Sequence, residues 1–489
     1  MSLLTKEQVE TCLKEHEQSY SALRPEGILW KYHTSHFAAN DPIEDAHASR
    51  IVERDSSSDS PSGDLLFFAV MDGHAGFSTS RLLSKTLLPA VALELSTLGK
   101  EPNHPPPKRS WLQSLLPWIH SGETPPINFD ADPKYVSLAI QTAFATLDSE
   151  IINAPLRILG EAMAHQGKDA TTLPDLSQHP MALASMFPAM SGSCALMALF
   201  DTAYRNLYVA CTGDCRAVAG VWEESEDGKG TWRADVLTED QTGRNPNELK
   251  RMQSEHPPDE ANTVIMRGRV LGGLEPTRAF GDARYKWSRE IQEILTKVFL
   301  QGNNEQMRAT PSLLKTPPYV TPRPVITHRK LSLDASSPPS PVPSKSKLRF
   351  LVLATDGLWD QLTSEEVVSL VGGYLSGLKG TIPKSDLPTL IPTTSGTTIE
   401  GKDKPRLKDT TGSWAFVDDN ISTHLIRNAF GGGDTEKLRK MLSIPAPLAR
   451  NYRDDVTCTV VFWEEGHENE GQVAMFSPEQ LQQQVKSKL

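Results

Sequence analysis

The sequence predicts an α/β fold in which helices cover one large sheet or two sheets. Apolar runs of strand length, amphipathic helical patterns and one very short connection between two of the runs support this prediction. Most of the runs lack a polar face, so we expect both of their faces to be covered. The runs are residues 65–71, 194–200, 207–212, 216–222, 350–355 and 457–463.

Two segments show the spacing of amphipathic helices. Residues 5–23 begin with a capping box formed by Thr5 and Gln8 and carry apolar side chains on one side. A second helix is predicted after Asp132, which can cap it, with Pro133 in its first turn. Its packing face is marked by apolar residues at spacings of three and four, namely Val136, Ile140, Phe144, Leu147 and Ile151.

The connection between residues 207–212 and 216–222 indicates antiparallel pairing. Only Gly213, Asp214 and Cys215 separate the two runs, a length that favours a hairpin. We therefore expect the sheet to be at least partly antiparallel.

Composition excludes several classes of protein. The chain has 489 residues, with 50 lysines and arginines against 61 aspartates and glutamates, and its formal net charge is −11. This acidic balance, without a cluster of basic residues, argues against a nucleic-acid partner. No apolar run approaches the ~18 residues of a transmembrane segment. Five cysteines in so long a chain predict free thiols in a reducing compartment. The first twenty residues do not resemble a transit peptide, so the protein is cytosolic or a leader is missing from this chain.

We expect a single domain over residues 1–489, with its core at about 25–465. Three polar, proline-containing stretches interrupt the pattern near residues 101–126, 332–347 and 381–412. Such segments bury too little apolar area to order themselves, so they are interpreted as surface insertions. The third lies between two predicted helices, and we hypothesise that it gates access of a partner.

Acidic residues stand next to the ends of several predicted strands. They are Asp72, Asp356, the pair Asp454 and Asp455, and the pair Glu44 and Asp45. If these ends converge, the mutual repulsion of the carboxylates is relieved most simply by a hard cation such as Mg²⁺ or Mn²⁺. Two such ions would acidify a water and clamp a phosphoryl group, which is a phosphate-ester hydrolase site. On spacing alone, solvated turn residues or helix caps remain the alternative.

Eight motifs in fixed order resemble those of the metal-dependent protein serine/threonine phosphatases of type 2C, a family of hydrolases. The resemblance spans Glu44 to Thr457 and implies a sandwich of two mainly antiparallel β-sheets flanked by α-helices. The motifs are Glu44-Asp45-Ala46-His47, Asp72-Gly73-His74-Ala75-Gly76, Ser191-Gly192-Ser193, Thr212-Gly213-Asp214-Cys215-Arg216, Leu237-Thr238, Arg278-Ala279-Phe280-Gly281-Asp282, Thr355-Asp356-Gly357-Leu358-Trp359-Asp360 and Asp454-Asp455-Val456-Thr457.

The resemblance also implies a role for each site residue. Asp72 would bridge two Mg²⁺ or Mn²⁺ ions, and the backbone carbonyl of Gly73 would bind one of them. A third, weaker metal site would involve Asp214 and Asp360. The remaining implied ligands are Glu44, Asp45, Asp356 and Asp454, with Asp455 behind them.

His74 matches the general acid that protonates the leaving serine or threonine oxygen, a role that suits an imidazole. The alternative is that His74 only orients a water. The implied mechanism is direct attack of a metal-bound water on the phosphorus of phosphoserine or phosphothreonine, with no phosphoenzyme.

The sequence is similar above all to the pyruvate dehydrogenase phosphatase branch of the family. Most type 2C enzymes carry a phosphate-binding arginine four residues before the glutamate, whereas this chain has Asn40 there, as that branch does. Asn40 is therefore the phosphate-binding candidate, and phosphate binding must differ in detail.

The branch resemblance implies a partner and a compartment. The implied substrate is the phosphorylated E1 component of pyruvate dehydrogenase, reached through the lipoyl domain of E2, in the mitochondrial matrix. Three alternatives stay open: a broad cytosolic type 2C phosphatase, a non-catalytic relative that binds phosphoproteins, and a hydrolase of small phosphate esters.

Overall fold

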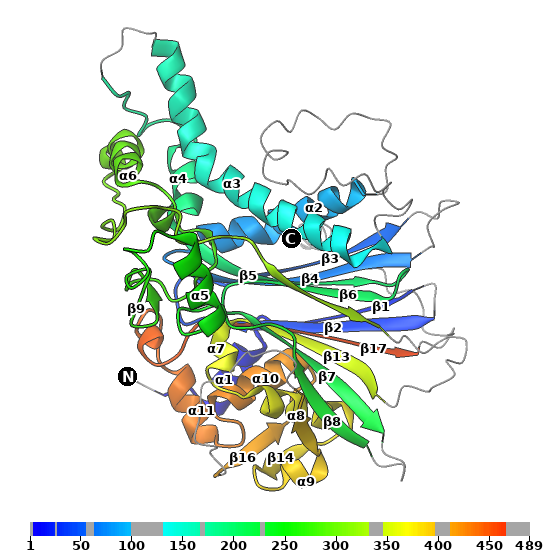
Figure 1. Cartoon of the computed structure of the whole chain (residues 1–489). Helices are drawn as coiled ribbons and strands as arrows, with labels where there is room; N and C mark the ends of the chain where they lie inside the picture. The colour runs from blue at the N-terminus through cyan, green and yellow to red at the C-terminus, as the bar shows by residue number, and fades with distance from the viewer. Residues whose placement is uncertain are drawn as a thin grey trace, which may run out of the picture.

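The computed structural model describes residues 3–24, 27–54, 63–98, 131–166, 172–224, 230–331, 346–396 and 411–465. These residues form a sandwich of two mainly antiparallel sheets with helices on both outer faces (Figure 1). The predicted fold class is confirmed.

The larger sheet has seven strands in the order β1-β2-β17-β13-β7-β8-β15. Neighbours pair antiparallel, except for β15, which adds to β8 in parallel. The strands are β1 (Gln18–Leu23), β2 (Ile28–Phe37), β7 (Arg216–Glu224), β8 (Gly230–Val236), β13 (Ser346–Ala354), β15 (Thr393–Ser395) and β17 (Val456–Glu465).

The second sheet has six strands, in the order β12-β6-β5-β4-β3 with the short β11 paired to β5. All of these pairs are antiparallel. The strands are β3 (Ala46–Arg54), β4 (Gly63–His74), β5 (Gly192–Asp201), β6 (Asn206–Thr212), β11 (Phe280–Gly281) and β12 (Val325–Lys330), and a separate two-stranded ribbon joins β9 (Ile265–Met266) and β10 (Arg269–Val270).

The two sheets face each other across a core of large apolar side chains, among them Trp30, Phe68 and Phe200. Helices α2 (Ser78–Ser96) and α3 (Pro133–Gln166) cover the outer face of the six-stranded sheet. Helices α1 (Lys6–Lys14), α8 (Ser364–Leu375) and α10 (Ile421–Phe430) cover the outer face of the seven-stranded sheet. Both faces of each sheet are therefore buried, which is why the central strands carry no polar face.

The remaining helical elements lie around these layers. They are α4 (Ala182–Met190), α5 (Pro246–Glu255), α6 (Arg289–Leu295), α7 (Asp356–Trp359), α9 (Leu387–Leu390), α11 (Thr435–Leu442), and the short turns η4 (Ala283–Tyr285), η5 (Thr296–Leu300), η6 (Gln301–Asn303) and η7 (Leu448–Asn451). Of these, α11 and α9 pack against the helices of the seven-stranded sheet.

The helix predicted for residues 5–23 is only partly correct. The capping box of Thr5 and Gln8 is present, but α1 ends at Lys14 and the chain continues as the edge strand β1. In this strand Tyr20 stacks on Tyr32 of β2, with ring centroids 4.6 Å apart. Pairing with β2 therefore outweighs a helical periodicity that is weak beyond the first three turns. The helix predicted after Asp132 is confirmed as α3.

The hairpin predicted around Gly213 is wrong. Strand β6 pairs with β5 and β12, whereas β7 pairs with β13 and β8, so the turn carries the chain from one sheet to the other. Gly213 has φ +106°, and a Cβ there would lie 2.2 Å from the sulfur of Cys194. The crossing places Asp214 between the two sheets. Runs that are apolar on both faces do not reveal to which sheet each one belongs.

The predicted insertions fall largely outside the described residues. This holds for residues 101–126, for 332–345 and for 397–410. The described part of the third stretch is packed: β14 (Gly380–Pro383) pairs with β16 (Ser413–Phe416), and β15 extends the larger sheet. Leu387 and Ile391 are buried there, which supplies the apolar contact that a free surface segment lacks.

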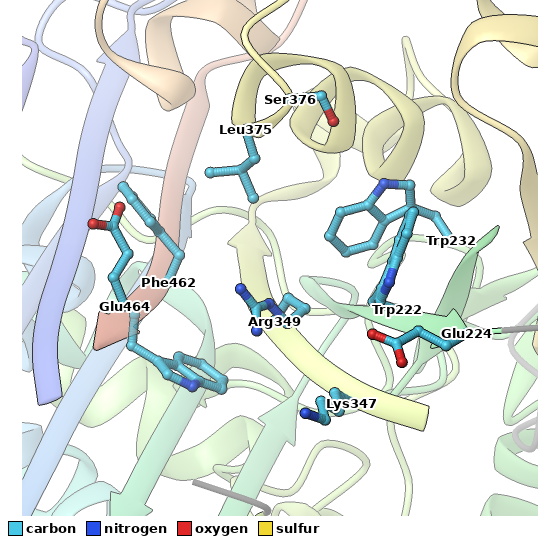
Figure 2. Close-up of a pocket in the computed structure, with 10 residues that line it drawn as sticks. Trp222, Glu224, Trp232, Lys347, Arg349, Leu375, Ser376, Phe462 and Glu464 are labelled. Carbon is cyan, nitrogen blue, oxygen red and sulfur yellow. The ribbon is translucent and has the colours of Figure 1, made fainter. Parts of the chain in front are cut away.

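The end of the larger sheet where β7 finishes and β13 begins holds an aromatic pocket of about 460 Å³ (Figure 2). Trp222 and Trp232 meet edge to face, with centroids 5.1 Å apart, and Phe462 lies across the pocket from them. The acid-bearing segments described below lie at the opposite end of the same strands. Within the described residues, no helix has the length and apolar character needed to cross a bilayer. All five cysteines are free thiols, as predicted.

Candidate functional site

Three aspartates from separate elements converge at one end of the sandwich. Asp72 lies near the end of β4, Asp214 in the turn that crosses between the sheets, and Asp356 at the first residue of α7. One carboxylate oxygen of each lies within 4.8 Å of the others. The backbone nitrogen of Asp356 also points to an oxygen of Asp72 at 3.5 Å. Asp72 and Asp356, the acids that follow two of the predicted strands, therefore lie in one cluster with Asp214.

A second set of acids surrounds this group. Asp45 accepts a hydrogen bond of 2.9 Å from the hydroxyl of Thr355, the residue before Asp356. Asp454 forms an ion pair with Arg450, one turn earlier in η7. Asp360 lies four residues after Asp356 and is not part of the group within 4.8 Å.

Asp455 has a different arrangement, because its carboxylate faces the backbone. It accepts from the backbone nitrogens of Ala39, Asn40 and Glu44, the last two at 2.9 Å. The amide nitrogen of the Asn40 side chain also donates to Asp455, at 2.9 Å. Asp455 thus ties the segment that carries Glu44 and Asp45 to the start of β17.

Gly73 is required by the close approach of two backbone segments. A Cβ at this position would lie 2.0 Å from the carbonyl oxygen of Glu44. The Glu44 side chain reaches back to the following loop, where it accepts from the backbone nitrogen of Gly76 at 2.5 Å. Glu44 and the strand end that carries Asp72 are therefore held side by side.

The acids of this site have abnormal protonation equilibria. Burial raises the pKa of Asp72 and Asp356 well above the usual value, and the charges of neighbouring aspartates raise it further. The pKa of Asp45 is also raised, by burial and by the charges of neighbouring aspartates. Burial likewise raises the pKa of Asp214 to about 6. Without a counter-charge, the cluster is therefore unfavourable when fully ionised.

The site fits a hard divalent cation. Oxygen Oδ1 of Asp356 is buried and has no hydrogen-bond partner within the described part of the chain. The convergent side chains offer only carboxylate oxygens, which suit Mg²⁺ or Mn²⁺ better than zinc. A cation would offset the repulsion among the carboxylates and give Oδ1 of Asp356 a partner.

His74 faces Asp282 beside the cluster. Its Nε2 lies 2.6 Å from a carboxylate oxygen of Asp282. Burial disfavours the charged imidazole, but Asp282, together with the charges of Asp214 and Glu44, outweighs this effect, so the pKa of His74 is raised. Sequence reasoning placed Asp282 in a motif without giving it a role, because the contact joins segments 208 residues apart.

Asp282 is itself held in place from α3. The buried Asp148 accepts hydrogen bonds from the backbone nitrogen of Gly281 and from Nζ of Lys286, each at 2.8 Å. Gly192 lies on the other side, where a Cβ would come within 2.1 Å of Nε2 of His74. These contacts fix the histidine and its partner.

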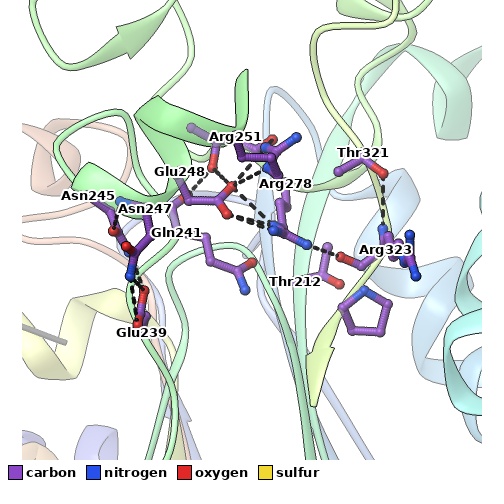
Figure 3. A network of polar contacts seen from close by, with 12 residues as sticks. Thr212, Glu239, Gln241, Asn245, Asn247, Glu248, Arg251, Arg278, Thr321 and Arg323 are labelled. Carbon is purple, nitrogen blue, oxygen red and sulfur yellow. Dashed lines mark hydrogen bonds and ion pairs between the residues drawn. The ribbon is translucent and has the colours of Figure 1, made fainter. Parts of the chain in front are cut away.

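A buried ion-pair network supports the segment that leads to Asp282 (Figure 3). Glu248 of α5 accepts from Arg278 and Arg251, each at 2.7 Å. Burial alone would raise the pKa of Glu248, but the two arginines lower it to about 2. Gln241, in the loop before α5, accepts from the backbone nitrogen of Gly213 at 2.7 Å and so supports the turn that carries Asp214.

A pocket of about 540 Å³ opens beside these residues. Its lining includes Asn40, Glu44, His74 and Asp282. Arginines also line it, namely Arg269, Arg284, Arg308 and Arg450. Arg450 is a second residue that sequence reasoning left without a role; its place four residues before Asp454 was the available signal. Anionic ligands are therefore favoured at the mouth of a carboxylate site.

Comparisons with known proteins agree with this geometry. Residues 145–377 match the family model described as Protein phosphatase 2C. A protein phosphatase 2C homolog of Schizosaccharomyces pombe is 35% identical over 93% of this chain and 84% of its own length. The mitochondrial pyruvate dehydrogenase (acetyl-transferring) phosphatase 1 of Saccharomyces cerevisiae is 33% identical, over 94% of this chain and 73% of its own length. The human protein of that name is 33% identical, over 94% of this chain and 83% of its own length.

Proposed function

This chain belongs to the protein phosphatase 2C family, whose members are metal-dependent phosphatases, and we propose that its substrate is the phosphorylated E1 component of pyruvate dehydrogenase. The similarity to relatives named pyruvate dehydrogenase phosphatases, over 94% of this chain, carries this proposal. The substrate would be reached through the lipoyl domain of E2. The same relatives are named mitochondrial, which supports a place in the matrix.

The carboxylate cluster is proposed to hold the metal ions. Asp72 would be a ligand of the metal ions, and Asp214 and Asp360 would hold a further ion at a weaker site. The other proposed ligands are Glu44, Asp45, the carbonyl of Gly73, Asp356 and Asp454. When bound, Mg²⁺ or Mn²⁺ acidifies water and neutralises charge on a phosphoryl group.

His74 is proposed as the general acid. Asp282 favours the protonated imidazole and fixes its orientation, so that a proton is available for the leaving serine or threonine oxygen. Water supplies the attacking oxygen, and no side chain of the site needs to form a bond to phosphorus.

Arg450 is proposed to contact the phosphate. The amide of Asn40 already donates to Asp455, so Asn40 is partly committed to holding the backbone. Arg450 lines the same pocket and carries the positive charge that Asn40 lacks. Guanidinium groups bind phosphate through two parallel N–H bonds, which would orient the phosphoryl group toward the cluster.

The test is release of phosphate from phosphorylated pyruvate dehydrogenase E1 and from an unrelated phosphoserine protein. Each is assayed with Mg²⁺, Mn²⁺ or a chelator, with Asp72→Asn as the blank. We expect metal-dependent release that strongly favours E1. Equal rates on both proteins would refute the substrate assignment and leave a broad phosphatase, and faster turnover of small phosphate esters than of either protein would refute a protein substrate. If no phosphate is released with any metal, the protein is instead a non-catalytic relative that binds phosphoproteins.

A further inference from the structure

The active-site pocket is lined by arginines in addition to Arg450, the proposed phosphate contact, and the part of the lining that they form is called its outer wall. Arg284 and Arg308 line this wall, on segments that do not carry the carboxylate cluster. Neither forms an ion pair with a carboxylate within the described part of the chain, although the whole chain has a net charge of −11. Arg284 uses its Nε to donate to the carbonyl of Ala309 at 2.7 Å. Its terminal nitrogens have no hydrogen bond or ion pair within the described ranges of the chain.

These arginines converge on one place. Arg284, Arg308 and Arg269 all lie close enough to the phenol of Tyr285 to affect its pKa, which burial raises overall. Arg284 also stands over the Tyr285 ring, with its guanidinium carbon 5.5 Å from the ring centroid. Arg269 differs from the other two because it is neutralised by Glu275. Arg284 and Arg308 thus lie near the same phenol, and neither has a carboxylate partner in an ion pair within the described residues.

Arg308 also lies between the active-site pocket and a second one, since it lines both. The second pocket has a volume of about 780 Å³ and lies along α6 and η5. Gln306, Met307 and Arg308 line both pockets. A peptide with its phosphoserine near His74 can therefore extend over Arg308 into this second pocket, and a residue next to the phosphoserine would then lie at the arginines.

We propose that Arg284 and Arg308 bind an acidic side chain that neighbours the phosphorylated residue of the substrate. This proposal rests on the proposed function and names a substrate class, phosphoserine segments with adjacent negative charge. The shared chemistry is an anionic oxygen group that accepts from two guanidinium groups. A carboxylate of Asp or Glu and a second phosphate both provide it.

The experiment compares three phosphopeptides that are identical except beside the phosphoserine, where they carry Asp, Asn or a second phosphoserine. With Mn²⁺ present, we expect kcat/KM to be roughly tenfold higher for the two anionic peptides than for the Asn peptide, mainly through KM. The anion that gives the larger gain identifies the natural source. Turnover of p-nitrophenyl phosphate, which has no neighbouring residue, is measured alongside, so that any general effect of the arginines on an anionic substrate is separated from the preference among the peptides.

The primary variant is Arg308→Gln, since this exposed side chain has no hydrogen bond or ion pair within the described residues to lose. We expect it to bring the three peptides to within about twofold of each other, mainly through KM, and Arg308→Glu to favour a Lys-flanked peptide. Arg157→Gln, an exposed arginine on α3, is the matched control and should keep the preference. A wild type that treats all three peptides alike, or a preference that survives Arg308→Gln, would overturn the proposal.

Failure of catalysis is separated from failure of this proposal by binding. Phosphonate analogues of the same peptides cannot be hydrolysed, and their affinity is measured by fluorescence anisotropy. Tighter binding of the acidic analogue that is lost in Arg308→Gln supports the proposal even if no peptide is turned over. Equal affinities for acidic and neutral analogues would contradict it.

Discussion

At the scale of single residues, the contact between His74 and Asp282 shows how the fold tunes a candidate acid. Burial would lower the pKa of the imidazole, but the carboxylate 2.6 Å away raises it instead. A general acid must be protonated, so a raised pKa extends the active range toward higher pH.

Replacement of Asp282 should therefore move the pH dependence of the reaction. In Asp282→Asn the pKa of His74 falls, and we expect the alkaline fall of kcat to shift to lower pH. The measurement is the pH profile of kcat on a phosphopeptide, with the surface variant Asp259→Asn as control. A profile that coincides with that of the wild type would show that the imidazole is not the acid.

At the scale of elements, single helices and strands could be predicted from the sequence, but the pairing of strands and the contacts between distant segments could not. The capping box at Thr5, the helix after Asp132 and the six apolar strands could be predicted from periodicity and turn chemistry. The sheet to which each strand belongs could not be predicted in this way. The short turn at Gly213 therefore predicts a hairpin, whereas in the structure it crosses from one sheet to the other. For the same reason, Asp72, Asp356 and Asp454 could be predicted as candidates, whereas the partnership of Asp282 with His74 could not.

The network around α5 predicts how stability depends on pH. The folded pKa of Glu248, about 2, lies below the ordinary 4.5. Its contribution is therefore present above pH 4.5 and is lost as the pH falls toward 2. We expect Glu248→Gln to lower the free energy of unfolding on the order of 3 kcal/mol near neutral pH, and by less at acidic pH.

Urea denaturation at pH 6 and at pH 3.5 measures this difference. Glu255→Gln is the matched control, because Glu255 pairs with the same Arg251 from a side chain that is 52% exposed. Ion pairs that are exposed to solvent contribute little to the free energy of unfolding. A loss in Glu248→Gln that is equal at the two pH values would contradict the ionic account.

At the scale of the whole molecule, the carboxylate cluster that the proposed function requires destabilises the metal-free folded state. Both sheets deliver aspartates to one buried end, where burial and mutual repulsion raise the pKa of Asp72 and Asp356. A raised pKa of an acid destabilises the folded state once the pH exceeds the ordinary value, and stability returns as the pH falls. A bound cation removes this penalty.

Asp356→Asn should therefore stabilise the metal-free protein while weakening its response to metal. At pH 7.5 with a chelator, we expect a melting temperature a few degrees above that of the wild type. Added Mn²⁺ should raise the melting temperature of the wild type by more than that of the variant. Thermal denaturation followed by circular dichroism measures both. A metal-free variant less stable than the wild type would contradict the repulsion argument.

The most direct test of the central claim, that the carboxylate end of the sandwich is a cation-dependent phosphatase site, is the initial rate of phosphate release from a phosphoserine protein as a function of Mn²⁺ concentration. We predict a saturable activation of the wild type and of Asp259→Asn, no activity in the chelator, and at least a hundredfold loss in Asp356→Asn, consistent with loss of a metal ligand. Equal activation of Asp356→Asn and the wild type would contradict the claim, because the cation would then act elsewhere.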